Sequence, residues 1–77
     1  MREKIIEILG EICPGVDVAN HTALVDDDIL NSIGIIRLVE AVESEFNIEI
    51  NYTDIEPENL NDVQAIQELI EKKCDSV

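Results

Sequence analysis

Ser32 is the residue of this chain whose position could support chemistry. It follows Asn31 at the abrupt start of a segment with helical apolar periodicity, shortly after the acidic run Asp26-Asp27-Asp28. The first turn of a helix leaves backbone N–H groups unpaired and carries a partial positive charge, which stabilises an exposed phosphate ester by about 0.3 to 1 kcal/mol. Serine is also favoured at any helix start. From local chemistry alone, Ser32 is therefore either an ordinary first-turn residue or an attachment point for an anionic group.

The residues around Ser32 do not form a catalytic motif. A nucleophile elbow needs glycine two residues before and two residues after the serine, but Leu30 precedes Ser32 and only Gly34 follows it. A serine triad needs a histidine, and the one histidine of the chain, His21, is expected to be a solvent-exposed residue of a long loop. The sequence thus favours a protein that presents a serine and performs no reaction itself.

The acidic run does not match a calcium-binding loop. Such a loop has acids at positions one, three and five and glycine at position six, whereas a count from Asp26 reaches Leu30 and Asn31 at the last two. We expect the three aspartates to form a solvated acidic patch. Cys13 and Cys74 are too few and too far apart for a metal cluster, and we expect two reduced, partly buried thiols rather than a disulfide.

Helical periodicity predicts three long helices. The first covers residues 2–13 and ends at Pro14-Gly15, and the second covers residues 32–46 with Asn31 as cap and Asn47 as left-handed terminator. The third covers residues 62–73, with Asn61 as its cap. Its predicted buried stripe consists of four apolar residues, Val63, Ile66, Leu69 and Ile70.

Two segments between these helices have weaker patterns. Residues 16–30 show no lasting period and read as a long loop, held down by its apolar members Val16, Val18, Leu24, Val25, Ile29 and Leu30. Residues 53–60 permit a short helix, with a capping box over Thr53-Asp54-Ile55-Glu56 that Pro57 opposes. We expect an all-α bundle of three longer helices and one short helix.

The helix over residues 32–46 is predicted to bury one face. At about 100° per residue, its core side lies within an arc of roughly 160° that holds Ile35, Ile36, Leu38, Val39, Val42 and Phe46. The opposite side holds Ile33, Gly34, Arg37, Glu40, Ala41 and Ser44. Ile33 is then an apolar residue beside the serine that its own helix does not bury. Either the preceding loop covers it or a partner enzyme does.

Composition limits the classes of function. The chain has 77 residues and a formal charge of −13, which predicts one domain over residues 1–77 and repulsion from nucleic acids and anionic lipids. Basic protein surfaces are the expected partners. No apolar run reaches the roughly 20 residues of a membrane span, and the first residues do not resemble a secretory signal. We expect a cytoplasmic, monomeric protein.

The segment from Leu24 to Ile50, most specifically from Asp28 onward, resembles the central region of the acyl and peptidyl carrier protein family. In that family an Asp-Ser-Leu triplet opens the second helix, and its serine carries 4'-phosphopantetheine. This chain has Asn31 and Ile33 where the family usually has Asp and Leu. The resemblance implies a four-helix carrier fold with a short third helix, no enzymatic activity, and a covalent phosphopantetheine on Ser32.

The resemblance also implies partners. These are a phosphopantetheinyl transferase, an adenylating ligase or acyltransferase that loads an acyl or aminoacyl cargo, and a downstream synthase or transferase. Gly34 is similar to D-alanyl carriers and Arg37 to many peptidyl carriers, so a discrete carrier loaded by a ligase is favoured over the fatty acid carrier. The expected partner-binding residues lie on and beside the serine: Asn31, Ile33, Gly34, Arg37, Glu40 and Glu43. The alternative is an unmodified acidic helical adaptor that binds a basic protein surface.

Overall fold

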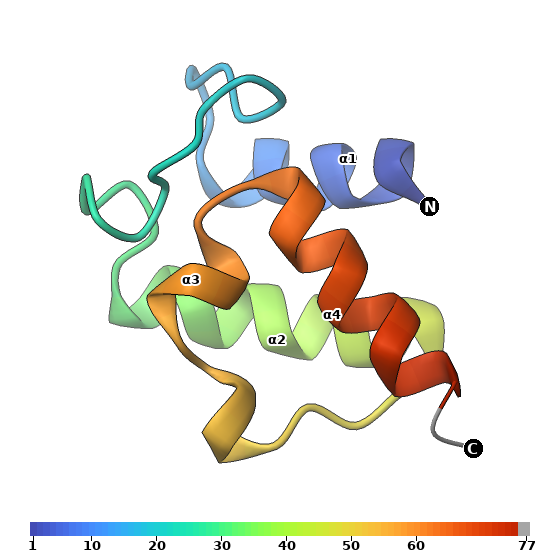
Figure 1. Cartoon of the computed structure of the whole chain (residues 1–77). Helices are drawn as coiled ribbons and strands as arrows, with labels where there is room; N and C mark the ends of the chain where they lie inside the picture. Colours follow the sequence, from blue (N-terminus) through green and yellow to red (C-terminus); the bar gives the residue numbers. More distant parts are fainter. Residues whose placement is uncertain (76–77) are drawn as a thin grey trace.

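The computed structural model describes residues 1–75, and over that range it is all-helical, with no strand. The elements are α1 (Arg2–Ile12), α2 (Ser32–Phe46), the 3-10 helix η1 (Tyr52–Asp54), α3 (Pro57–Leu60) and α4 (Val63–Asp75). Helices α1 and α2 run in opposite directions and are joined by a long loop, while α4 crosses both and the short α3 lies beside its start (Figure 1). The predicted bundle of three longer helices and one short helix is confirmed.

The helix boundaries follow local signals closely. Helix α2 has the predicted bounds, and Asn47 takes the left-handed conformation with φ 53° while its N–H donates to the Glu43 carbonyl. A residue in the left-handed conformation cannot continue a right-handed helix. Asparagine tolerates positive φ better than most residues, so it is well suited to end α2. Helix α1 ends one residue earlier than predicted, since Cys13 already leaves the helical region at φ −122° and ψ 66°.

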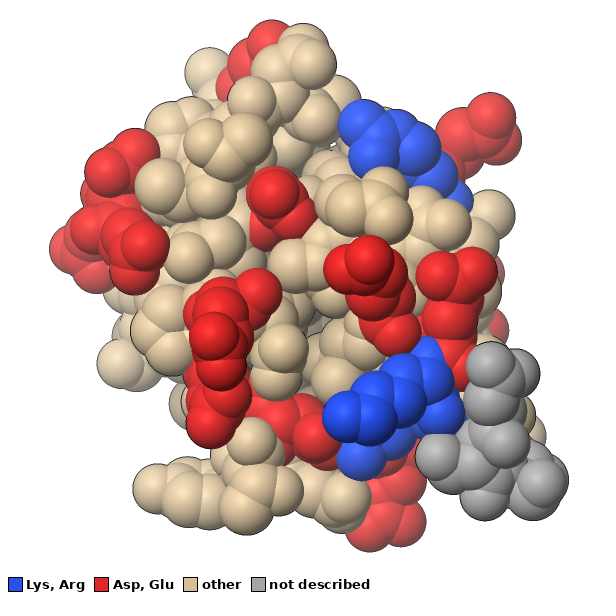
Figure 2. Space-filling view, viewed as in Figure 1, with Lys and Arg blue, Asp and Glu red and all other residues tan. Residues whose placement is uncertain are grey.

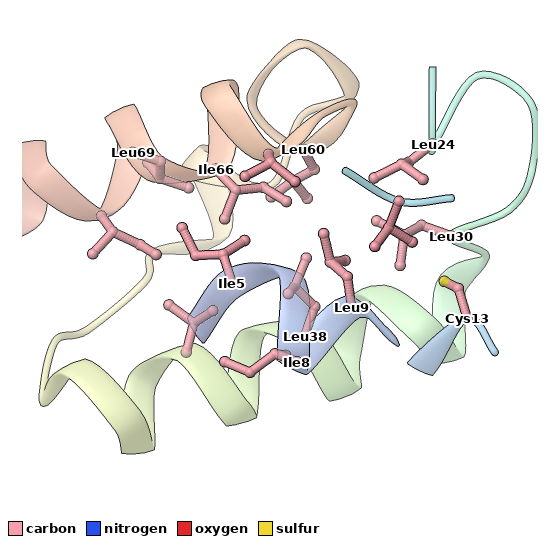
Figure 3. Packing of buried hydrophobic residues seen from close by; sticks show 14 residues of the cluster. Ile5, Ile8, Leu9, Cys13, Leu24, Leu30, Leu38, Leu60, Ile66 and Leu69 are labelled. Atoms are coloured by element: carbon pink, nitrogen blue, oxygen red, sulfur yellow. The ribbon is translucent and has the colours of Figure 1, made fainter. Parts of the chain in front are cut away.

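The hydrophobic core lies where α1, α2 and α4 meet. Ile5 and Leu9 of α1 are fully buried, and they lie between α2 and α4 (Figure 3). The predicted stripe of α4 is confirmed, because its four members are all buried. Leu24 and Leu30 extend the core under the loop that precedes α2, as that loop's apolar residues predict.

The predicted core face of α2 is partly wrong. Ile36 is 56% exposed, whereas Gly34 is buried together with Leu38 and Val42. The buried side is rotated toward Gly34 because α1 ends against it. A Cβ built on Gly34 would lie 3.4 Å from Ile12 Cγ2. The absence of a side chain at Gly34 lets α1 approach α2 there.

The segment between α2 and α4 contains two short helices, η1 and α3, instead of one. The predicted capping box beginning at Thr53 is wrong, because the Asn51 N–H donates to Asp54 Oδ2 at 2.9 Å and η1 starts earlier. Glu56 is extended at φ −128° and ψ 147°, and Pro57 opens α3 at its first position. The first position of a helix needs no intrahelical N–H bond, so the proline fits there.

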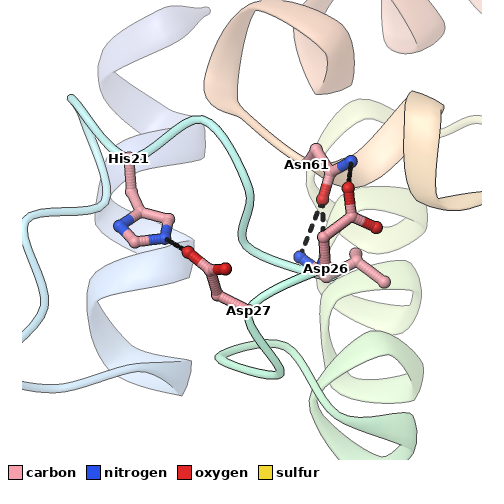
Figure 4. A network of polar contacts seen from close by, with 5 residues as sticks. His21, Asp26, Asp27 and Asn61 are labelled. Carbon is pink, nitrogen blue, oxygen red and sulfur yellow. Dashed lines mark hydrogen bonds and ion pairs between the residues drawn. The ribbon is translucent and has the colours of Figure 1, made fainter.

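Asn61 was predicted to cap the last helix, and this prediction is wrong. Asp62 is the cap, since its Oδ1 accepts a 2.7 Å hydrogen bond from the Ala65 N–H. Asn61 instead reaches across to the long loop, where its Oδ1 accepts hydrogen bonds from Val25 N–H at 2.9 Å and Asp26 N–H at 3.1 Å. Its Nδ2 donates to Asp26 Oδ2 at 3.1 Å (Figure 4).

The long loop is more ordered by polar contacts than its sequence predicts. His21 is half-buried rather than solvent-exposed, and its Nε2 lies 2.8 Å from Asp27 Oδ2 (Figure 4). The aspartates are exposed, as expected of an acidic patch, but two of the three hold the loop through His21 and Asn61.

The two cysteines are free and differ in burial. Cys13 is buried, and its thiol donates to the Ile29 carbonyl at 3.7 Å, whereas Cys74 is exposed. The predicted absence of a disulfide between them holds, but the prediction that both are partly buried is wrong.

Candidate functional site

Ser32 is the first residue of α2 and is exposed. The residue before it does the capping, since Asn31 Oδ1 accepts a 2.8 Å hydrogen bond from the Gly34 N–H. Asn31 is extended at φ −84° and ψ −176°, the conformation usual for a residue that precedes a helix. The Ser32 hydroxyl is therefore not needed to start the helix and is presented to solvent on a rigid first turn.

Two apolar side chains of α2 are exposed beside this serine. Ile33 is 66% exposed and Ile36 is 56% exposed. The preceding loop does not cover Ile33, which removes one of the two alternatives for that residue. The surface next to Ser32 is thus partly apolar in a protein whose other surfaces are rich in carboxylates.

A groove of about 230 Å³ opens where α1, the long loop and the start of α2 come together. One residue of α1, two residues of the loop and three residues of the first turns of α2 line this groove. They are Ile12, Ile29, Asn31, Ile33, Gly34 and Arg37. Burial raises the pKa of the Cys13 thiol, which lies next to Ile12 in the chain and bonds to the Ile29 carbonyl. A raised pKa keeps this thiol protonated and unreactive at neutral pH.

The predicted partner-binding residues differ in how exposed they are. Ile33, Arg37 and Glu40 are exposed, as predicted, while Asn31 is exposed but uses its side chain for the cap. Gly34 is buried, which contradicts its predicted place on the exposed side, although it contributes to the groove.

Glu43 is also less available to a partner than the sequence suggests. It is half-buried, and its Oε2 accepts a 2.9 Å hydrogen bond from the Ile50 N–H. This contact holds the segment after α2 against the helix. Sequence reasoning missed the structural role because the two residues are seven positions apart and meet only after the chain has turned at Asn47.

Acidic residues greatly outnumber basic residues in this protein. The chain has 18 acidic and 5 basic residues, and carboxylates are spread over the face seen in Figure 2, with basic side chains gathered at two places. Four of the basic side chains have partners within the described part of the chain. Arg2 donates to the Ala19 carbonyl, Lys4 pairs with Glu7 and Glu45, Lys73 pairs with Asp54, and Lys72 has a contact of its own.

Two further classes of site are not seen in the described residues. Within residues 1–75 no group of three or more His, Cys, Asp or Glu side chains is arranged to hold a metal ion. In the same range no helix has both the length and the apolar character needed to cross a membrane.

The described residues form a small all-helical bundle whose second long helix begins with an exposed serine, Ser32. Over 55 residues, which are 71% of the chain, the sequence is 47% identical to an acyl carrier protein of Buchnera aphidicola subsp. Baizongia pistaciae (strain Bp), and 68% of that protein is covered. The chain belongs to the acyl carrier protein family, whose members are carriers rather than enzymes. No family model matches it. No solved structure matches it either.

Proposed function

We propose that this chain, as one carrier domain, holds an acyl or aminoacyl cargo as a thioester on a 4'-phosphopantetheine arm attached to Ser32. The proposal rests on the different roles of two neighbouring residues at the start of α2. Asn31 caps the helix, so Ser32 is exposed and its hydroxyl is not needed for the fold. Members of the acyl carrier protein family generally carry this group covalently.

The chemistry of the first turn fits the group. A phosphodiester on Ser32 would lie at the positive end of the α2 dipole, beside backbone N–H groups that have no intrahelical partner. The arm supplies a terminal thiol that forms the thioester with the cargo. The protein needs no base or nucleophile of its own, because the attaching and loading enzymes bring them.

Other hydroxyls are worse candidates for the attachment. Ser44 is exposed but lies inside α2, where the helix dipole has no free end. Thr53 lies within η1, a 3-10 helix of three residues. Ser76 lies outside the residues that the structure describes. Ser32 is therefore the residue we assign to the arm.

The partners that this role requires act in sequence at the same place. A phosphopantetheinyl transferase attaches the arm, an adenylating ligase or acyltransferase loads it, and a downstream synthase or transferase receives the cargo. We propose that these enzymes contact the exposed residues around Ser32, chiefly Ile33, Arg37 and Glu40, and that they meet the protein as a monomer in the cytoplasm. Asn31, Gly34 and Glu43 support that surface. Asn31 caps α2, Gly34 lines the groove, and Glu43 holds the segment after α2 against the helix.

The test is the intact mass of the purified protein after incubation with coenzyme A and a promiscuous phosphopantetheinyl transferase. We expect the wild-type protein to gain one phosphopantetheine and Ser32→Ala to gain none. Ser44→Ala is the matched control, because it removes an exposed hydroxyl from the same helix, and it should be modified like the wild type.

Two outcomes would reject the carrier role. The first is a wild-type protein that stays unmodified, which would favour an acidic adaptor that binds a basic protein surface. The second is a Ser32→Ala protein that still gains the arm. Circular dichroism of each variant shows that a missing modification does not come from unfolding.

A further inference from the structure

We infer that the groove beside Ser32 receives an apolar side chain that is flanked by a carboxylate on the protein that loads the arm. The inference rests on the proposed function and names the chemistry of one partner. Its first support is the position of the groove. Asn31 and Ile33, the two chain neighbours of Ser32, both contribute to it, so whatever occupies the groove lies next to the serine.

The second support is the charge of Arg37. This residue is exposed and lines the groove. Among the residues that the structure describes, it is the one Lys or Arg side chain without an ion pair or hydrogen bond, although the chain has 18 acidic residues. An arginine fork is well suited to a carboxylate. A partner that brings a carboxylate to Arg37 would gain a charge-assisted hydrogen bond here.

The third support is the shape and polarity of the groove walls. Three isoleucines line it, each from a different element: Ile12 from α1, Ile29 from the loop and Ile33 from α2. Ile33 is 66% exposed, so much of its apolar surface is available for burial by a partner. Gly34 contributes backbone without a side chain, which keeps this side of the groove open.

Together these features select against the partner that the overall charge would predict. A protein of charge −13 attracts basic surfaces at long range, but a basic group brought to this groove would meet Arg37. Attachment and loading of the arm can therefore be separated by charge. Basic surfaces meet the carboxylates, and the loading enzyme is recognised at close range by an apolar residue next to an acid.

The experiment uses a short probe with this chemistry. Isotope-labelled protein is titrated with the blocked tripeptide acetyl-Leu-Asp-Leu-amide, and its backbone amide shifts are followed by NMR. The control peptide is acetyl-Leu-Lys-Leu-amide, which long-range attraction to the acidic protein would favour. We expect saturable shifts at Ile12, Ile29, Ile33 and Gly34 with the aspartate peptide, and weaker ones there with the lysine peptide.

Three variants test the role of the guanidinium. Arg37→Gln should lose the preference for the aspartate peptide, and Arg37→Lys should keep it in part because the charge remains. Lys4→Gln is the matched control, since it removes one positive charge from an exposed ion pair on α1, and it should bind like the wild type.

The inference is overturned if the groove amides show no saturable shift, if both peptides act equally, or if Arg37→Gln binds like the wild type. The intact-mass assay is independent of this result. A protein that accepts the arm but does not bind the aspartate peptide remains a carrier without this docking site. A protein that binds the peptide at the groove but never accepts the arm fails as a carrier, and the loading partner inferred here fails with it.

Discussion

Lys73 of α4 forms an ion pair with Asp54 of η1, and each of the two side chains is only 15% exposed. The hydrogen bond from Lys73, together with the one from the Asn51 N–H, lowers the pKa of the Asp54 carboxyl below its ordinary value. The pair connects the last helix to the short 3-10 helix. The ion pair should therefore make the stability of the protein depend on pH in the acidic range.

The stabilisation from Asp54 should depend on pH in one direction. Because its pKa is lower in the folded state than in the unfolded state, the contribution is present above the unfolded value and is lost as the pH falls through the folded value. We expect Asp54→Asn to lower the free energy of unfolding at pH 7 by about 1 to 3 kcal/mol, between the values for exposed and buried pairs. Urea unfolding at a series of pH values measures this.

The difference between wild type and Asp54→Asn should shrink toward zero as the pH falls below 4. A difference that stays constant down to pH 2.5 would mean that the ionised pair is not the source of the stabilisation. Glu7→Gln is a suitable control, because Glu7 is in an exposed ion pair with Lys4 and should contribute little.

Asn61 should be more important for the loop than for the helix that follows it. Asn61→Ala leaves the N–H groups of Val25 and Asp26 without their acceptor, at a cost of about 1 to 3 kcal/mol. Asn61→Asp keeps an acceptor but places a second carboxylate against Asp26. We expect faster amide hydrogen exchange at Val25 and Asp26 in Asn61→Ala, with the α4 amides little changed. Fast exchange confined to the first turn of α4 would instead identify Asn61 as a cap.

Ile36 and Leu38 should differ sharply in their contribution to stability although both are apolar residues of α2. Leu38 is 1% exposed, so Leu38→Ala should cost about 2 to 5 kcal/mol. Ile36 is 56% exposed, and Ile36→Ala should change the free energy of unfolding by less than about 1 kcal/mol. Thermal unfolding of the two variants checks the rotated core face. Similar losses for both would restore the face predicted from periodicity.

Asn31→Asp should keep the cap and change the rate of modification. An aspartate accepts the Gly34 N–H as well as asparagine does, so the stability should be nearly unchanged. A transferase that approaches with a basic surface should modify the variant faster, with the gain shrinking as salt screens the attraction. Initial rates at low and high salt measure the effect. Asn31→Ala is the stability control and should lose about 1 kcal/mol with the cap. Equal rates for wild type and Asn31→Asp at low salt would leave Asn31 with the capping role alone.

The sequence by itself determined the elements whose signals are local. Helix α2 could be bounded at Ser32–Phe46 because Asn31 and Asn47 act on backbone groups within a few residues of themselves. The buried stripe of α4 could also be predicted, because four apolar residues at helical spacing leave one orientation for the helix. The exposure of Ser32 followed from its position at that start.

Tertiary structure decided which side of α2 is covered and which polar residues connect distant segments. Periodicity placed Ile36 in the core and Gly34 on the opposite side of α2. The end of α1 packs at Gly34 instead and leaves Ile36 exposed. Asn61 and Asp62 are both residue types that cap helices well. In the folded protein Asn61 accepts a hydrogen bond from the backbone of the nearby loop, and Asp62 caps the helix. The groove at Arg37 likewise depends on three segments that are distant in sequence, so no local pattern could show it.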